Sequence, residues 1–201
     1  MELILERGPK DPPGATALPW GYRVAVTVPA SGVTYAVDSD SYTIPSGLSF
    51  ASAADLQVGQ EVQVVVVPAS VTTSNGTGAM GPVGPPARIS FTTSAVTLEP
   101  SEITAKISSI NSPDFTITTF PNFLLPPTAM GASPAVTPAQ VTVETTTQTT
   151  YANLTPDTFA GLTDNSIVSI AGWLFATPKG TTPSTIAAEK IVGRPGPTPE
   201  F

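Results

Sequence analysis

The side chains in this sequence that could do chemistry are carboxylates, hydroxyls and a few amines, because the chain contains no His and no Cys. Nucleophilic triads built on Ser or Cys need an imidazole base, and most zinc and copper sites rely on His or Cys ligands. The composition therefore argues against both kinds of site. We expect no catalytic residues, no metal site, no cofactor and no enzyme activity.

The spacing of the acidic residues indicates that they lie in turns and at outward-facing strand positions. Asp38 and Asp40 have the opening spacing of a calcium loop, but the twelve-residue template then needs Gly and Glu where the chain has Thr and Ser. A turn with solvated carboxylates is favoured. Glu61, Glu144 and Asp164 are scattered in the sequence and form no visible pair. A glycosidase that works with two carboxylates alone is a third hypothesis for the function.

Large aromatic side chains are candidates for stacking on sugar rings. Trp173 lies on a strand whose neighbours Val168, Ile170 and Leu174 are apolar, so burial in a core or an interface is favoured over sugar binding. The same two interpretations apply to the rest of the set, which comprises Trp20, Tyr22, Tyr35, Tyr42 and Phe175.

Two further kinds of segment are candidate contact or modification sites. Phe123, Leu124 and Leu125 form an apolar run between prolines, and an exposed apolar patch of this kind usually marks an assembly contact. Asn75 and Asn153 each begin an Asn-x-Thr glycosylation sequon. Such sequons arise often by chance in a Thr-rich chain, so unmodified Asn is the favoured alternative.

The composition excludes several classes of partner. With 15 acidic and 8 basic residues, the net charge of −7 repels a nucleic-acid backbone and an anionic membrane surface. The longest aliphatic run, Val64 to Val67, is far shorter than the roughly 20 apolar residues that span a bilayer. We expect no nucleic-acid binding and no membrane span.

The cellular location follows less directly from the sequence. The first seven residues lack the basic and apolar regions of a secretory signal, so either the protein is cytosolic or a signal has been removed. A chain rich in Thr, Ser and Pro and free of Cys is typical of exported bacterial surface proteins. An extracellular or cell-surface location is therefore favoured.

The elements that position these side chains are strands. Apolar and polar residues alternate through much of the chain between Pro and Gly, and helical periodicity is hard to find. In residues 24–28 three valines share one face, and in residues 103–107 Ile, Ala and Ile share one face while Thr and Lys share the other. The pattern predicts an all-β protein.

These strands occur in the same order twice along the chain. Leu56 in the first copy corresponds to Leu162 in the second, and Ile89 corresponds to Ile191. The repeat predicts two tandem five-stranded barrels, at residues 21–99 and 100–194, joined near Glu99. We expect residues 100–194 to bury a core of their own.

The repeated pattern resembles a known family. Two strands, a short helical turn, a Leu-x-x-Gly-x-x-Val-x-Val strand and a closing Ala-x-x-Ile strand resemble the uncharacterised OB-like barrel domains found in tandem in exported proteins of acidobacterial-type bacteria. The match is best over residues 100–194, at Trp173-Leu174-Phe175 and at Ala188-Glu189-Lys190-Ile191. The turn glycine is kept as Gly59 in the first copy and replaced by Asn165 in the second. The resemblance implies an OB-like fold and an exported location, and no mechanism.

Outside the barrels, residues 1–20 contain one candidate strand and a Pro-rich tether, and residues 195–201 form a Pro-rich tail. A lone strand at Leu3, Ile4 and Leu5 must pair with the edge of a sheet. The leading hypothesis is a non-enzymatic extracellular subunit that forms a fibre or other homopolymer by donating this strand to a neighbour. In the alternative arrangement the strand pairs within its own chain. The second hypothesis is a surface carbohydrate-binding module with glycans as partners.

Overall fold

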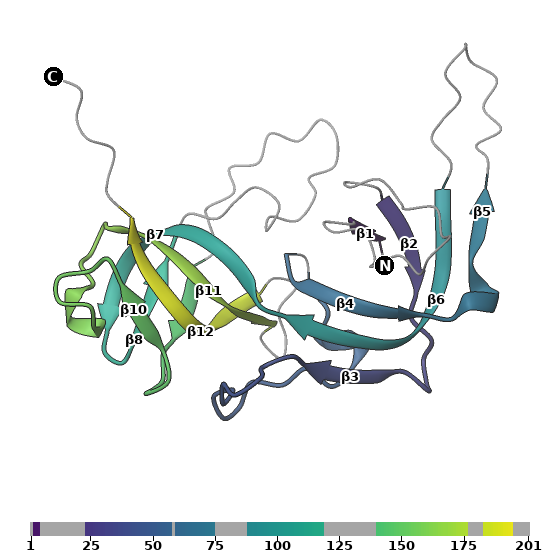
Figure 1. Cartoon of the computed structure of the whole chain (residues 1–201), viewed down its shortest axis with the longest axis horizontal. Coiled ribbons are helices and arrows are strands. Elements are labelled where there is room, and N and C mark those ends of the chain that lie inside the picture. Colours follow the sequence, from purple (N-terminus) through teal and green to yellow (C-terminus); the bar gives the residue numbers. More distant parts are fainter. Residues whose placement is uncertain are drawn as a thin grey trace, which may run out of the picture. The chain divides into compact units, whose positions relative to one another are not determined.

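The computed structural model of the chain describes residues 2–4, 23–57, 59–74, 88–118, 140–176 and 183–194 (Figure 1). These residues form β-strands and short 3-10 turns, with no α-helix among them. The all-β class predicted from the alternating sequence is confirmed. Within this described part, no helix is long and apolar enough to cross a membrane.

One sheet is built mainly from the first half of the chain. Strand β6 pairs with β2, β3, β4 and β5, and β1 extends the sheet beyond β2. The strands are β1 (Glu2–Ile4), β2 (Arg23–Thr27), β3 (Thr34–Val37), β4 (Glu61–Val66), β5 (Thr72–Ser74) and β6 (Arg88–Glu99). Short 3-10 turns lie at Ala53–Asp55 and Pro68–Ser70.

The other sheet closes on itself. Its strands are β7 (Ser101–Asn111), β8 (Asp114–Ile117), β9 (Val141–Glu144), β10 (Thr150–Ala152), β11 (Ile167–Ala176) and β12 (Pro183–Arg194), with a 3-10 turn at Phe159–Gly161. Five of them form a ring in the order β7, β8, β9, β12, β11 and back to β7, which we call the barrel. Strands β9 and β12 pair in parallel, and β10 pairs in parallel with another part of β12.

The two predicted barrels are not equivalent in the structure. The second predicted unit contains the ring of five strands, whereas pairing in the first sheet closes no ring among the described residues. The contacts divide the chain into one unit of residues 1–34 and 64–96 and another of residues 35–63 and 97–201. This division differs from the predicted one, because residues 35–63 belong with the barrel.

The barrel has a large apolar core. Strand β7 alternates as its sequence predicts, with Ile103, Ala105 and Ile107 buried and the residues between them exposed. The other strands of the ring contribute further buried side chains, namely Phe115, Ile117, Val141, Val143, Val168, Ile170, Leu174, Ile186, Ala188 and Ile191. Closure of the ring lets every strand present one face to this core.

The unit of residues 1–34 and 64–96 has a much smaller core. Among its described residues, the buried apolar cluster consists of Val24, Val26 and Phe91, and partly buried Val64 and Ile89 pack against it. Val24 and Val26 lie on one face of β2, as the alternation predicts. Among the described residues, this cluster is the main apolar packing around β2.

Residues 38–60, of which Val58 lies outside the described part, form a segment that we call the strap. Its Tyr42 is stacked on Trp173 of β11, with ring centroids 5.1 Å apart, and both side chains are buried. The Tyr42 hydroxyl donates to the Ala188 carbonyl oxygen at 3.0 Å, and Trp173 Nε1 donates to the Asp38 carbonyl oxygen at 3.0 Å. The strap is thus fastened to the barrel by its backbone and by its aromatic side chain.

The far end of the strap is fastened by Gln60. Its side-chain Nε2 donates to the Asp55 carbonyl oxygen at 3.1 Å and to the Leu174 carbonyl oxygen at 2.8 Å. Between the two ends, the Ser52 hydroxyl accepts from the Ala54 amide and the Asp55 carboxylate accepts from the Ser52 amide, which caps the 3-10 turn.

The stacked pair yields a stability prediction. Tyr42→Phe removes the hydrogen bond to the Ala188 carbonyl oxygen and the one accepted from the Thr146 hydroxyl at 3.4 Å, and should lower the free energy of unfolding by about 1 kcal/mol or more. Tyr42→Ala also removes the ring and should lower it by about 3 kcal/mol or more. Tyr35→Phe is the control, because Tyr35 is only partly buried and contacts Phe50 through its ring. Chemical denaturation measures the free energy of unfolding of the three variants. A larger loss in the control than in either Tyr42 variant would contradict this account.

Candidate functional site

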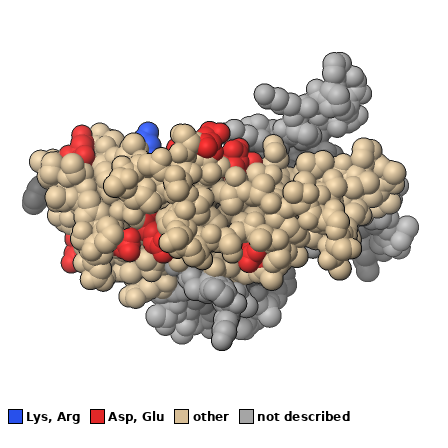
Figure 2. Space-filling view, turned by 90° about the horizontal axis from the view of Figure 1, so that it is seen from below, with Lys and Arg blue, Asp and Glu red and all other residues tan. Residues whose placement is uncertain are grey.

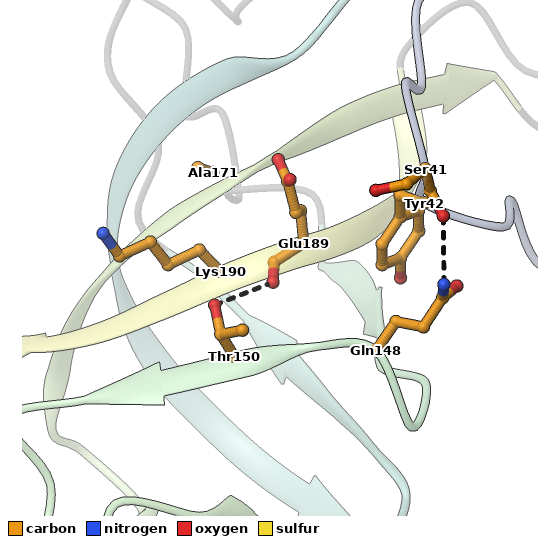
Figure 3. Close-up of a pocket in the computed structure, with 7 residues that line it drawn as sticks. All are labelled: Ser41, Tyr42, Gln148, Thr150, Ala171, Glu189 and Lys190. Atoms are coloured by element: carbon orange, nitrogen blue, oxygen red, sulfur yellow. Dashed lines mark hydrogen bonds between the residues drawn. The ribbon is translucent and has the colours of Figure 1, made fainter.

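A groove lies between the strap and the outer surface of the barrel, within one compact unit (Figure 3). Its volume is about 490 Å³, which is in the range of sites for small molecules. The strap, the turn before β10 and strands β10, β11 and β12 all contribute, through Ser41, Tyr42, Gln148, Thr150, Ala171, Glu189 and Lys190.

The groove is held open by fixed polar contacts. Gln148 accepts a hydrogen bond from the Thr43 amide at 2.8 Å through Oε1 and donates to the Ser41 carbonyl oxygen at 3.0 Å through Nε2. The Thr150 hydroxyl donates to the Glu189 carbonyl oxygen at 3.3 Å (Figure 3). With Tyr42 also fixed, the wall formed by Tyr42 and Gln148 is positioned before any ligand arrives.

A β-bulge shapes one side of the groove. Ala171 pairs with Lys190 and Gly172 pairs with Ala188, so Glu189 is an extra residue on β12. As a result Glu189 and Lys190 are both exposed between buried neighbours, where a regular strand would turn one of them inward. No hydrogen bond or ion pair joins either side chain to another described residue.

Gly172 explains why the sequence can form this bulge. A Cβ atom placed on Gly172 would overlap the Ala187 carbonyl oxygen and press on the backbone of Ala188. Glycine alone lets β12 approach this closely. The bulge is therefore a consequence of the sequence at this position.

Carboxylates gather near the start of the strap. Burial raises the pKa of the Glu99 carboxyl above its ordinary value of 4.5, and the charge of Asp38, the charge of Glu61, a hydrogen bond with Asp38 and the charge of Asp40 raise it further. Burial and then the charge of Asp114 likewise raise the pKa of Glu144. Figure 2 shows a face on which acidic side chains recur among uncharged ones.

Among these carboxylates, the side chains of Asp38 and Glu99 are hydrogen-bonded to each other. In the part of the chain that the structure describes, no group of three or more His, Cys, Asp or Glu side chains could hold a metal ion. The Asp38-Ser41 segment that carries the opening of the calcium template folds as a turn, in which the Tyr42 amide donates to the Ser39 carbonyl oxygen at 2.7 Å and Asp40 has a φ of 43°. This is the turn favoured from the sequence.

One hydroxyl contacts a carboxylate on the outside of the barrel. Ser169 donates to Glu102 Oε1 at 2.9 Å, and Arg194 Nη2 donates to the Ser169 hydroxyl at 3.1 Å and to Glu102 Oε1 at 3.3 Å. These residues come from β7, β11 and β12, which are adjacent in the ring. The carboxylate is paired with a cation, so the cluster links three strands and supplies no strong base for the hydroxyl.

The candidate sugar-stacking residues are core residues wherever the structure describes them fully. Tyr42, Trp173 and Phe175 are 6%, 2% and 1% exposed, so their ring faces are not available to a ligand. Tyr35 is partly buried against Phe50. The favoured interpretation as core holds for Tyr42, Trp173 and Phe175, and Trp20 and Tyr22 lie outside the described residues.

The predicted assembly and modification residues are only partly described. The backbones of Leu3 and Ile4 lie in β1, which pairs antiparallel with β2 of the same chain, and Leu5 lies outside the described residues. Asn153 is exposed in a turn with a φ of 55°. The other predicted positions, Asn75, Phe123, Leu124 and Leu125, also lie outside the described residues.

The sequence interpretation missed the groove. The residues that line the groove are far apart in the chain, and the strap brings Ser41 and Tyr42 to the barrel. One local signal was present: Glu189 and Lys190 interrupt the alternation of β12 with two successive charges, and Gly172 interrupts β11. Together these features are typical of a bulge.

Comparison of the chain with protein-family models, with curated proteins and with solved structures found no match. The resemblance to tandem OB-like domains therefore stays a prediction.

The carboxylates around Glu99 yield a prediction on pH dependence. Because the folded-state pKa of Glu99 is raised, its ionised form opposes folding at neutral pH. The protonated Glu99 carboxyl favours folding. This contribution to stability is fully present below the ordinary pKa of 4.5 and is lost as the pH rises through the folded-state pKa.

Glu99→Gln should therefore raise the melting temperature near pH 7 and leave it close to that of the parent near pH 4. Thermal denaturation at both pH values measures this. Glu189→Gln is the control, since it removes the same charge from an exposed strand position. Stabilisation by Glu99→Gln that is equally large at both pH values would show that ionisation of Glu99 is not the cause.

Proposed function

We propose that the protein is a non-enzymatic structural subunit that acts outside the cell or on its surface and assembles with copies of itself. In this proposal the N-terminal strand β1 of one copy pairs with β2 of the next. The absence of His and Cys from the chain supports a role without catalysis. The small apolar cluster among the described residues of the unit that contains β1 and β2 supports a role for intermolecular contacts in its stability.

The observation that carries the proposal is the position and the connection of β1. It pairs only with β2 among the described strands, with Leu3 opposite Val24 and Ile4 opposite Arg23. Residues 5–22 join the two strands, and 18 residues of chain can reach up to about 60 Å. An antiparallel hairpin needs only about 2–5 connecting residues. The connection is thus long enough for β1 to make the same pairing with a neighbour.

Strand exchange needs no new interface, because the intermolecular and intramolecular pairings have the same register. Because β1 and β2 belong to one chain, β1 competes for its own β2 at an effective concentration in the millimolar range. Intermolecular pairing should therefore dominate at high local concentration, as at a crowded surface. Exposed Val65 and Val71, 52% and 49% accessible, offer further apolar contact area in the same unit.

The strand yields the prediction that tests this proposal. Deleting residues 1–8, or making Leu3→Asp together with Leu5→Asp, should leave the barrel folded and abolish assembly at high protein concentration, because the apolar strand is lost. Multi-angle light scattering over a concentration series measures the assembly, and a thermal transition checks the fold.

The matched control is Leu3→Val together with Leu5→Val, which keeps an apolar strand and should assemble as the parent does. If the parent is monomeric at every concentration, or if the deletion variant assembles normally, the proposal fails. A monomeric parent would leave pairing of β1 with its own β2 as the arrangement in solution.

A further inference from the structure

We propose that the groove between the strap and the barrel binds a neutral saccharide. This role is independent of assembly through β1. The sugar would lie on the outer face of the sheet rather than on aromatic rings, because Tyr42 and Trp173 are buried against each other.

The polar groups of the groove favour a ligand that carries many hydroxyls. The Glu189 carboxylate accepts hydrogen bonds, the Lys190 ammonium donates them, and the Ser41 hydroxyl does both. Saccharide hydroxyls also donate and accept, so a sugar can hydrogen-bond with each of these kinds of group. Hydrogen bonds with charged partners are about twice as strong as those between neutral groups.

The charge of the groove favours a neutral ligand. Glu189 and Lys190 compensate each other, while the chain as a whole carries a net charge of −7. An anionic ligand would meet the repulsion of the surrounding carboxylates. A cationic ligand that approaches the Glu189 carboxylate would be repelled by the neighbouring Lys190 ammonium.

The shape of the groove is set by specific backbone and side-chain contacts. The bulge that presents Glu189 and Lys190 depends on Gly172, and the opposite wall depends on the two hydrogen bonds of Gln148. The small side chain of Ala171 also lines the groove (Figure 3). These features come from four separate segments of the chain and converge on one place.

The test uses the full-length protein and four neutral sugars: cellobiose, maltose, lactose and N-acetylglucosamine. Saturation-transfer NMR detects binding and titration calorimetry measures affinity, with the zwitterion glycylglycine as a competing probe. We expect at least one sugar to bind and glycylglycine not to bind. Glu189→Ala should weaken sugar binding about tenfold or more, since it removes a charged hydrogen-bond partner.

Two further variants make the result specific to the groove. Ala171→Leu places a larger side chain in the groove and should abolish binding, whereas Glu102→Ala removes an equally charged side chain elsewhere on the barrel and should change affinity less than twofold. Thermal melts confirm that each variant is folded. Failure of all four sugars to bind, binding that survives both Glu189→Ala and Ala171→Leu, or preferential binding of glycylglycine would each overturn the proposal.

Discussion

The contact between Tyr42 and Trp173 is the interaction on which the larger unit of this protein depends. Trp173 is almost fully buried, and a buried indole N–H needs an acceptor, which is the Asp38 carbonyl oxygen of the strap. Tyr42 in turn covers the indole ring and donates to the Ala188 carbonyl oxygen. Without the strap, the barrel would expose a large aromatic side chain to water.

This dependence explains why the repeat in the sequence does not coincide with the compact units. The repeat places residues 38–60 in the first copy, where they lie between two strands of the first sheet. Their buried aromatic side chains, Tyr42 and Phe50, belong by contact to the unit that contains the barrel. A sequence repeat reports how strands follow one another along the chain, whereas a compact unit is decided by which apolar surfaces cover one another.

The fold class and much of the barrel core could be predicted from the sequence, because alternation is a local property. Ile103, Ala105 and Ile107 are buried in the structure, and so are Val168 and Ile170. The core role favoured for Trp173 also followed from its apolar neighbours. The hydrogen-bond partners of Trp173 and Tyr42 could not be found in this way, since Asp38 and Ala188 are distant in sequence and only the folded strap brings them close.

The candidate groove could not be predicted from the sequence either, because it also depends on which strands pair. Its two charged residues, Glu189 and Lys190, are nevertheless adjacent in the chain. Two successive exposed charges on a strand are informative only when the partner strand is known, because the bulge is defined by the pairing of Ala171 with Lys190 and of Gly172 with Ala188. The glycine supplies the space and the extra residue supplies the second outward side chain.

The two proposed sites differ in what their surroundings can tolerate. The groove is attached to a barrel with an extensive core, so its side chains can be held in place at little risk to folding. Strand β1 belongs to a unit whose described apolar cluster is small, where each added strand contributes much of the stability. A unit with an extensive core suits recognition of a small molecule, since the backbone that carries the groove is held by packing. Strand β1 suits exchange between copies, because the contacts that are lost when β1 leaves its own chain are regained in the same register on a neighbour.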